Sequence, residues 1–264
     1  MLEQYLNKIN VRPTPRATCP FDPGYDPATV EGHIEQSGHL IATLKISMAC
    51  WMVASEAATR RKIEAARNAG IPTVAGGGPF ETAVAQRALP DYLDLCADVG
   101  LTRIECGEGF TDLTIAPQEI VRQAGERGLE VEFELGEKHS GRFTDEVTAE
   151  LIATGERWLQ AGALRLVVEA RESAQDVGLF SAPGEFDATQ AERFVDAFGL
   201  ERVLFEAPNK ASQFALINHF GPEVQLGNVR LEEVLRVEIY RRGLHSDAFG
   251  RSELRPPPPA GDAA

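Results

Sequence analysis

The sequence has few lysines and no long apolar run, and each shortage excludes a class of protein. Lysine supplies five of the 26 basic residues, against 40 acidic ones, so the formal net charge is −14. Nucleic acids and anionic membranes bind proteins through basic surfaces, so we expect neither as a partner. No stretch approaches the roughly 20 apolar residues that span a bilayer. The first ten residues, MLEQYLNKIN, also lack the pattern of a secretory signal.

Cysteine is scarce as well. The four cysteines, Cys19, Cys50, Cys96 and Cys106, form no CxxC pair. Reduced, mostly buried thiols are typical of cytoplasmic proteins, and we expect that location. With 264 residues, 43% of them apolar, the chain can bury a full core without disulfides or metal. We expect one domain over residues 1–250 and a disordered proline-rich tail over 251–264.

Short apolar runs recur about every 30 residues, the period of a strand, a loop and a crossover helix. The expected strands are 18–21, 40–46, 72–75, 103–106, 130–135, 164–169, 202–205 and 224–226. Strands that alternate with helices indicate parallel βαβ units, and eight of them predict a single-domain α/β fold, the (β/α)8 TIM barrel. An open doubly wound sheet is the alternative.

Helix signals lie between these runs. Asp26 is placed to cap a helix that begins at Pro27, and a second helix is expected over 54–69, before Gly70. Thr144 begins a third, whose apolar stripe is Val147, Leu151, Ile152 and Leu159.

Charged residues and glycines gather where the expected strands end. They are Lys45, Gly76, Gly77, Gly78, Glu105, Glu108, Glu134, Lys138, Glu169, Arg171, Glu172, Glu206, Lys210, Gly227 and Asn228. The carboxyl ends of barrel strands form one mouth, where active sites lie. A charge there is costly unless it is paired, bound to a ligand or used in chemistry.

Two interpretations stay open for these residues. The glutamates are either working groups or structural partners of Lys45, Arg171 and Lys210 in a buried ring of ion pairs. The Gly76–Gly78 run is either a flexible loop or a phosphate-binding loop that uses bare backbone N–H groups. Cys106 has no neighbouring base and is a poor candidate nucleophile.

Six ordered sequence blocks resemble the phosphosulfolactate synthase family. They are IECGEGFTDL (Ile104–Leu113), FELGEKH (Phe133–His139), VVEARESAQDVGLF (Val167–Phe180), LFEAPNKASQFALI (Leu204–Ile217), VQLGNV (Val224–Val229) and YRRGLHSDAFG (Tyr240–Gly250). The resemblance covers residues 21–250 and implies a barrel lyase of coenzyme M biosynthesis. Such a lyase adds sulfite to phosphoenolpyruvate, with Mg²⁺, and forms 2-phospho-3-sulfolactate.

The resemblance also suggests roles for the residues at the mouth. Lys138 is the candidate acid, and Lys45 and Arg171 would hold charged substrate groups beside it. Substrate binding is assigned to Gly77, Gly78, Glu172, Lys210 and Asn228. Carboxylate oxygens suit Mg²⁺, so the candidate ligands are Glu105, Glu134, Glu169 and Glu206. We expect small anionic substrates and a homo-oligomer.

The first half of the chain departs from the family pattern. Pro23 replaces a lysine, the run Ile46–Cys50 (ISMAC) replaces Phe-Gly-Trp-Gly-Thr, Gly78 replaces a threonine and Glu108 an aspartate. These changes leave Lys138 and the glutamates in place. They keep open a diverged enzyme that adds another nucleophile to a phosphorylated enol or enoyl acid. A non-catalytic, stress-related barrel protein is the third possibility.

Overall fold

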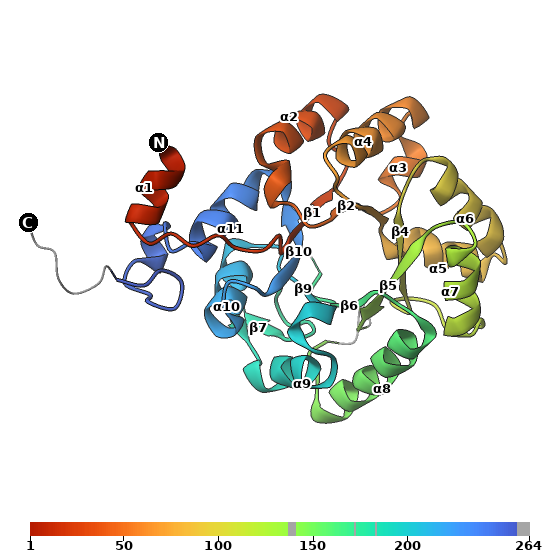
Figure 1. Cartoon of the computed structure of the whole chain (residues 1–264). Helices are drawn as coiled ribbons and strands as arrows, with labels where there is room; N and C mark the ends of the chain where they lie inside the picture. Colours follow the sequence, from red (N-terminus) through yellow and green to blue (C-terminus); the bar gives the residue numbers. More distant parts are fainter. Residues whose placement is uncertain (137–140, 172, 183, 258–264) are drawn as a thin grey trace, which may run out of the picture.

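The computed structural model describes residues 1–136, 141–171, 173–182 and 184–257. Eight parallel strands close into a barrel in the order β1-β10-β9-β6-β5-β4-β3-β2 (Figure 1). Their bounds are β1 Thr18–Asp22, β2 Leu44–Ile46, β3 Thr73–Ala75, β4 Arg103–Gly107, β5 Glu130–Leu135, β6 Arg165–Val168, β9 Val203–Glu206 and β10 Gln225–Arg230. The predicted (β/α)8 barrel is therefore confirmed, because each expected strand region contains a barrel strand.

Helices surround the barrel (Figure 1). They are α2 Pro27–Ser37, α3 Cys50–Val53, α4 Glu56–Asn68, α5 Gly77–Ala85, α6 Leu89–Asp98, α7 Pro117–Gly125, α8 Asp145–Ala161, α9 Ala188–Phe198, α10 Lys210–Phe220 and α11 Val234–Arg241. Two predicted caps are confirmed. The Asp26 side chain accepts hydrogen bonds from the N–H groups of Ala28 and Thr29, and that of Thr144 accepts one from Val147.

One strand boundary needs correction, and two short elements were not expected. β2 begins at Leu44 rather than residue 40, because Gly38–Leu40 form a 3₁₀ turn. The helix expected over 54–69 is α4, and the short α3, which the extended backbone of Ala54 separates from it, was not expected. A two-stranded hairpin of β7 (Phe180–Ala182) and β8 (Glu185–Phe186) was not expected.

The buried centre of α8 differs from the predicted stripe. Val147, Leu151, Ile152 and Leu159 are only partly buried against the core. The residues buried between them are Thr148, Gly155 and Trp158, and the Trp158 ring stacks on Phe133 with 4.3 Å between centroids. The residues of the predicted stripe therefore lie on either side of the buried residues through which α8 packs on the barrel.

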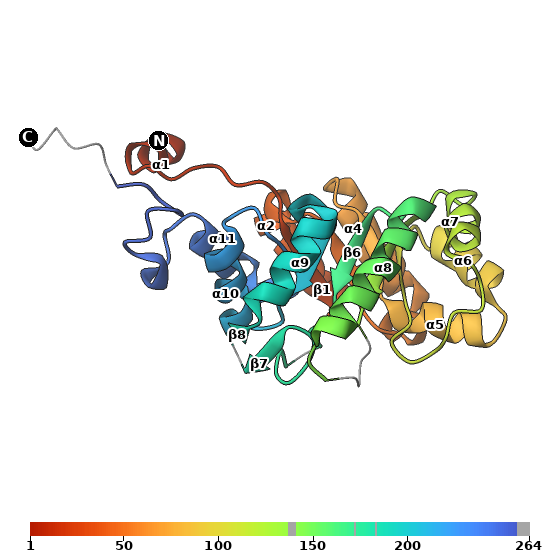
Figure 2. The same cartoon turned by 90° about the horizontal axis from the view of Figure 1, so that it is seen from below.

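Both ends of the described chain lie on the same side of the barrel. Helix α1 (Leu2–Lys8) buries none of its residues and projects from the body (Figure 2). Leu254 is buried in the core, and Asn10 donates a hydrogen bond to the carbonyl of Pro257 at 3.3 Å. Residues of the expected disordered tail, Leu254 and Pro257, therefore contact the body of the protein. Among the described residues, no helix has the length and apolar character needed to cross a membrane.

Candidate active site

A pocket of about 1280 Å³ opens at the carboxyl ends of the barrel strands. It brings together nine of the residues to which the sequence assigned a catalytic, binding or metal-ligand role. They are Lys45, Gly77, Gly78, Glu105, Glu134, Glu169, Arg171, Glu206 and Asn228. Strands β2, β4, β5 and β9 carry four of the charged ones, and Glu169 directly follows β6. Lys138 and Glu172 lie outside the described residues.

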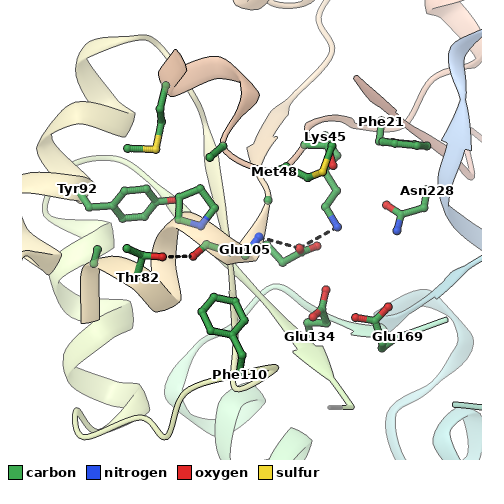
Figure 3. Close-up of a pocket in the computed structure, with 18 of the residues that line it drawn as sticks. Phe21, Lys45, Met48, Thr82, Tyr92, Glu105, Phe110, Glu134, Glu169 and Asn228 are labelled. Carbon is green, nitrogen blue, oxygen red and sulfur yellow. Dashed lines mark hydrogen bonds and ion pairs between the residues drawn. The ribbon is translucent and has the colours of Figure 1, made fainter. Parts of the chain in front are cut away.

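Lys45 is the cation at the centre of this group (Figure 3). Its ammonium nitrogen lies 2.8 Å from Oε1 of Glu105 and 3.5 Å from Oε1 of Glu206. Burial lowers the pKa of Lys45, but Glu105, Glu206 and Glu134 together raise it above its ordinary value. Lys45 is therefore a fixed positive charge and a poor proton donor.

Glu105 connects Lys45 to the glycine run. Its Oε1 also accepts a hydrogen bond of 3.0 Å from the N–H of Gly77, at the first turn of α5. A carboxylate is stabilised at a helix N-terminus, where it satisfies an otherwise unpaired N–H. The Gly76–Gly78 run is thus the start of a helix, and the N–H of Gly77 already binds a carboxylate.

Glu206, on the other side of Lys45, is held by two further groups. Its Oε2 accepts a 3.0 Å hydrogen bond from the N–H of Ala170, and its Oε1 accepts one from the amide of Asn228. Asn228 has a φ of 52°, a left-handed backbone that asparagine tolerates better than most residues. This conformation fixes Asn228 at the mouth.

Glu134 and Glu169 point into the pocket side by side (Figure 3). Burial, followed by the carboxylates of Glu206 and Glu134, raises the pKa of Glu169 to about 11. The N–H of Arg171 donates a 2.5 Å hydrogen bond to Glu169, which opposes that rise. In the absence of a cation, Glu169 therefore holds a proton at neutral pH.

The pocket offers oxygen donors to a metal ion, but not a complete ligand cage. Within the described ranges, no group of three or more histidine, cysteine, aspartate or glutamate side chains has a metal-binding arrangement. Lys45 already engages Glu105 and Glu206. Mg²⁺ commonly uses one or two carboxylates and completes its shell with water and substrate oxygens. Among the four predicted ligands, Glu134 and Glu169 lie side by side at the pocket surface and offer such a pair of carboxylates (Figure 3).

Lys210 does not join the lining of this pocket. It is the first residue of α10, about half exposed, and its ammonium lies 2.8 Å from the carboxylate of Asp247. It also lies over the ring of Phe214 at 5.2 Å. The structure thus gives Lys210 a surface ion pair, and not the contact with the mouth that the sequence suggested.

Two residues of the site were missed by sequence reasoning. Arg230, at the end of β10, lines the pocket, and its place after the last expected strand was a usable signal. Glu81 is fully buried in α5 and accepts hydrogen bonds from the N–H groups of Phe110 and Thr111. It escaped notice because no helix was expected over the residues that follow the glycine run. Glu81 holds the loop after β4 against the pocket.

The cysteines take no part in this chemistry. All four are free thiols, and three of them, Cys19, Cys96 and Cys106, are buried. Burial raises the pKa of Cys106 well above its ordinary value, as it raises that of Cys96 to about 12. The expectation that Cys106 is a poor nucleophile agrees with this, because the reactive species is the thiolate.

Comparison with known proteins decides the family. The sequence model of the (2R)-phospho-3-sulfolactate synthase (ComA) family matches residues 11–247. The chain belongs to this family. The phosphosulfolactate synthase of Methanocaldococcus jannaschii is 29% identical over 89% of this chain and 94% of that protein. The enzyme of the same name from Methanothermobacter thermautotrophicus is 26% identical over 90% and 92%. A third, from Bacillus subtilis, is 28% identical over 71% and 75%.

Solved structures with the same fold have little sequence in common with this phosphosulfolactate synthase family member. The YdjI aldolase from Escherichia coli K12 has a TM-score of 0.55 at 15% identity, over 96% of this chain and 94% of that one. KGPDC from Streptococcus mutans has a TM-score of 0.52 at 13% identity, over 86% and 99%. These likenesses support the barrel architecture. The sequence relatives place the chain among lyases.

Proposed function

We propose that this family member adds sulfite to C3 of phosphoenolpyruvate and forms 2-phospho-3-sulfolactate. Membership of the phosphosulfolactate synthase family supports the reaction class. The observation that carries the proposal is Lys45, a fixed cation among buried carboxylates at the barrel mouth. Such a charge, positioned in advance, stabilises an anion that forms during a reaction.

The reaction places negative charge where Lys45 can act on it. The sulfur lone pair of sulfite forms the new bond to C3, and the electrons of the C2–C3 double bond move toward the substrate carboxylate. C2 then takes a proton, which gives the phosphorylated sulfolactate without loss of any group. Because its pKa is raised, Lys45 keeps its charge throughout.

Substrate anions need further positive charge at a mouth rich in glutamates. Arg171 and Arg230 both line the pocket and bring two guanidinium groups to its rim. A guanidinium binds phosphate or carboxylate through two parallel hydrogen bonds. Gly78 and Asn228 line the same surface and remain candidate binding residues. Lys210 is left out, because it pairs with Asp247.

Lys138 remains the proposed acid for C2. It occupies the lysine position of the FELGEKH block, directly beyond the described end of β5. A positioned acid contributes roughly 10²–10⁴ in rate. A lysine suits this role better than an arginine, whose guanidinium gives up its proton far less readily.

Mg²⁺ is part of the proposal, with Glu134 and Glu169 as the side chains that would hold it. When bound, it would neutralise charge on the substrate oxygens. The high pKa of Glu169 is consistent with a place that takes either a proton or a cation. Glu105 and Glu206 then serve mainly to hold Lys45.

The test is a search for the product. Purified protein is incubated with phosphoenolpyruvate, sulfite and Mg²⁺, and the adduct is sought by mass spectrometry. We expect it with the wild type, and at a level reduced by at least about 10² with Lys45→Met, which keeps the length of the side chain without the charge. No adduct from well-folded wild-type protein would refute the proposal.

A further inference from the structure

The pocket is larger than the two reactants named above require. Its volume of about 1280 Å³ exceeds the ~300–1,000 Å³ typical of sites for drug-sized ligands. Phosphoenolpyruvate has three carbons, and sulfite has none. Both would fit at the charged end beside Lys45 and leave the rest of the pocket to solvent.

The remaining space has a different character. We call it the apolar lobe. Its apolar lining is Met48, Met52, Pro79, Ala83, Leu95 and Phe110, and Thr82, Gln86 and Asp91 add three polar side chains at its edge. Figure 3 shows Tyr92, Thr82 and Phe110 at one end of the pocket and Glu134, Glu169 and Asn228 at the other. The lobe thus extends outward from the mouth, between α3 on one side and α5 and α6 on the other.

Several walls of the lobe are exposed apolar side chains. Met48, Met52, Leu95 and Phe110 each leave more than a third of their surface in contact with solvent. Scattered exposed hydrophobic residues need no explanation, but a cluster that lines one cavity marks a binding surface. Methionine side chains are flexible and polarisable, so they adapt to apolar groups of varied shape.

The backbone holds Met48 where the two parts of the pocket meet. Its φ is 51°, a left-handed conformation that a residue with a side chain adopts only at a cost. A Cβ added at Gly76 would lie 3.1 Å from the Met48 nitrogen, so the two segments are in close contact. Met48 lies beside Lys45 (Figure 3). A ligand in the lobe therefore adjoins the charged end directly.

The lobe coincides with the part of the chain that departs from the family pattern. Met48 and Gly78 line the pocket, and Cys50 donates a hydrogen bond to the carbonyl of Pro23 at 3.3 Å directly behind it. Three of the four departures, at Pro23, in the Ile46–Cys50 run and at Gly78, thus lie in or next to this part of the pocket, whereas Glu108 does not line it.

We infer that the pocket also binds an amphiphilic anion. Its acidic group lies at the charged end, and an apolar group the size of a butyl chain or a phenyl ring lies in the apolar lobe. The inference rests on the proposed function for the charged end, which binds anions. It adds a larger organic acid to the ligands of this site and leaves sulfite and phosphoenolpyruvate as the proposed reactants.

The experiment compares phosphonates that share one anionic head. Binding of methylphosphonate, butylphosphonate and phenylphosphonate is measured by calorimetry with Mg²⁺ present, and competition with phosphoenolpyruvate shows that they occupy this pocket. Each fully buried methylene strengthens binding about fourfold. Because the lobe is open to solvent, we expect butylphosphonate to bind at least about tenfold more tightly than methylphosphonate.

Two matched double variants test whether the butyl group binds in the apolar lobe. Met52→Gln with Leu95→Gln makes the lobe polar, and we expect the gain from the butyl group to shrink to about threefold or less. Leu235→Gln with Ile239→Gln changes two residues of α11 outside the pocket, each 40% exposed against 38% for Leu95. That control should keep the full gain.

Three results would overturn the inference. They are equal affinity for the methyl and butyl compounds, failure of the series to bind, and an undiminished gain in the lobe variant. A change of oligomeric state in the lobe variant, seen by sedimentation with no butyl preference in the wild type, would assign the lobe to a subunit contact instead. The sulfite adduct is assayed separately. Its absence beside a clear butyl preference would refute the proposed reaction and leave the amphiphilic ligand standing.

Discussion

Lys45 and Lys210 provide a matched pair of lysines with opposite environments. Lys45→Met would leave Glu105 and Glu206 buried without their cation. Breaking a buried pair in this way costs about 3–5 kcal/mol. We expect that loss in urea unfolding near pH 8 and a smaller one near pH 5, because the stranded carboxylates gain stability by taking up protons as the pH falls.

Lys210→Met is the control for that measurement. Its partner Asp247 is on the surface, and exposed pairs of this kind contribute little. We expect unfolding close to that of the wild type at both pH values. A large loss with Lys210→Met, or none with Lys45→Met, would contradict the ion-pair geometry.

The proposed acid is tested through turnover. Lys138→Ala should lower kcat by about 10²–10⁴ and change KM much less, because the proton moves only in the transition state. Lys138→Arg should restore little, and Lys210→Ala should leave both constants near the wild-type values. Steady-state kinetics of adduct formation separates these outcomes. Nearly full turnover in Lys138→Ala would remove that residue from the mechanism.

Single residues were predicted well where the strand pattern alone decided their place. Lys45, Glu105 and Glu134 lie on barrel strands, and parallel strands point their carboxyl ends to one side. Lys210 was expected at the mouth, but it is the first residue of α10 and pairs with Asp247 on the surface. Gly77 was placed at the pocket, but no sequence pattern shows that its N–H would bind Glu105.

At the scale of elements, two glycines in helices test how closely helices pack on the barrel. A Cβ added to Gly155 of α8 would lie 2.6 Å from the ring of Phe198 and 2.7 Å from Leu166. Gly155→Ala should therefore destabilise the protein by about 1–3 kcal/mol, despite the better helix propensity of alanine. The measurement is the free energy of unfolding in urea.

Gly32 in α2 is the matched control. Within the described part of the chain, a Cβ there would meet no heavy atom within 4 Å. Gly32→Ala should stabilise the protein by up to about 1 kcal/mol, since only the helix propensity changes. If both substitutions shift stability in the same direction, the close contact of α8 with α9 is wrong.

The elements that the sequence did not predict share a physical cause. Helix α3 has four residues and the β7–β8 hairpin five in its two strands, too short for a periodic pattern to appear. The caps at Asp26 and Thr144 were predictable, because a local hydrogen bond determines each of them. Long-range packing, as at Gly155, leaves no local signal.

The whole barrel could be predicted from the sequence, because eight apolar runs with helices between them allow few other arrangements. The apolar lobe could not be predicted in this way. Its walls come from α3, α5, α6 and the loop after β4, which approach one another only when the barrel closes. Met52 and Leu95 are ordinary helix residues in sequence, so their common surface depends on tertiary structure.

The net charge of −14 and the buried carboxylates both act on the stability of the whole molecule as pH rises. In the folded protein without metal, burial, Glu206 and Glu134 raise the pKa of Glu169 to about 11, from an ordinary value of 4.5. Between these values the folded state keeps a proton that the unfolded state loses. The contribution of Glu169 to stability is therefore fully present below about pH 4.5 and is lost as pH rises, by up to about 1.4 kcal/mol per pH unit for one proton.

Glu169→Gln removes the carboxyl group that holds this proton, so the stability of the variant should fall less steeply with pH. When a chelator is present, the variant should be more stable than the wild type near pH 9. Glu150→Gln makes the same substitution at an exposed position of α8 and should keep the wild-type slope. Mg²⁺ would replace the proton at Glu169, so it should raise the melting temperature of the wild type more near pH 9 than near pH 6. Glu169→Gln should lose that gain. Parallel slopes for wild type and Glu169→Gln in thermal unfolding would show that Glu169 is not the group that holds the proton, and Mg²⁺ would then have no proton to displace there.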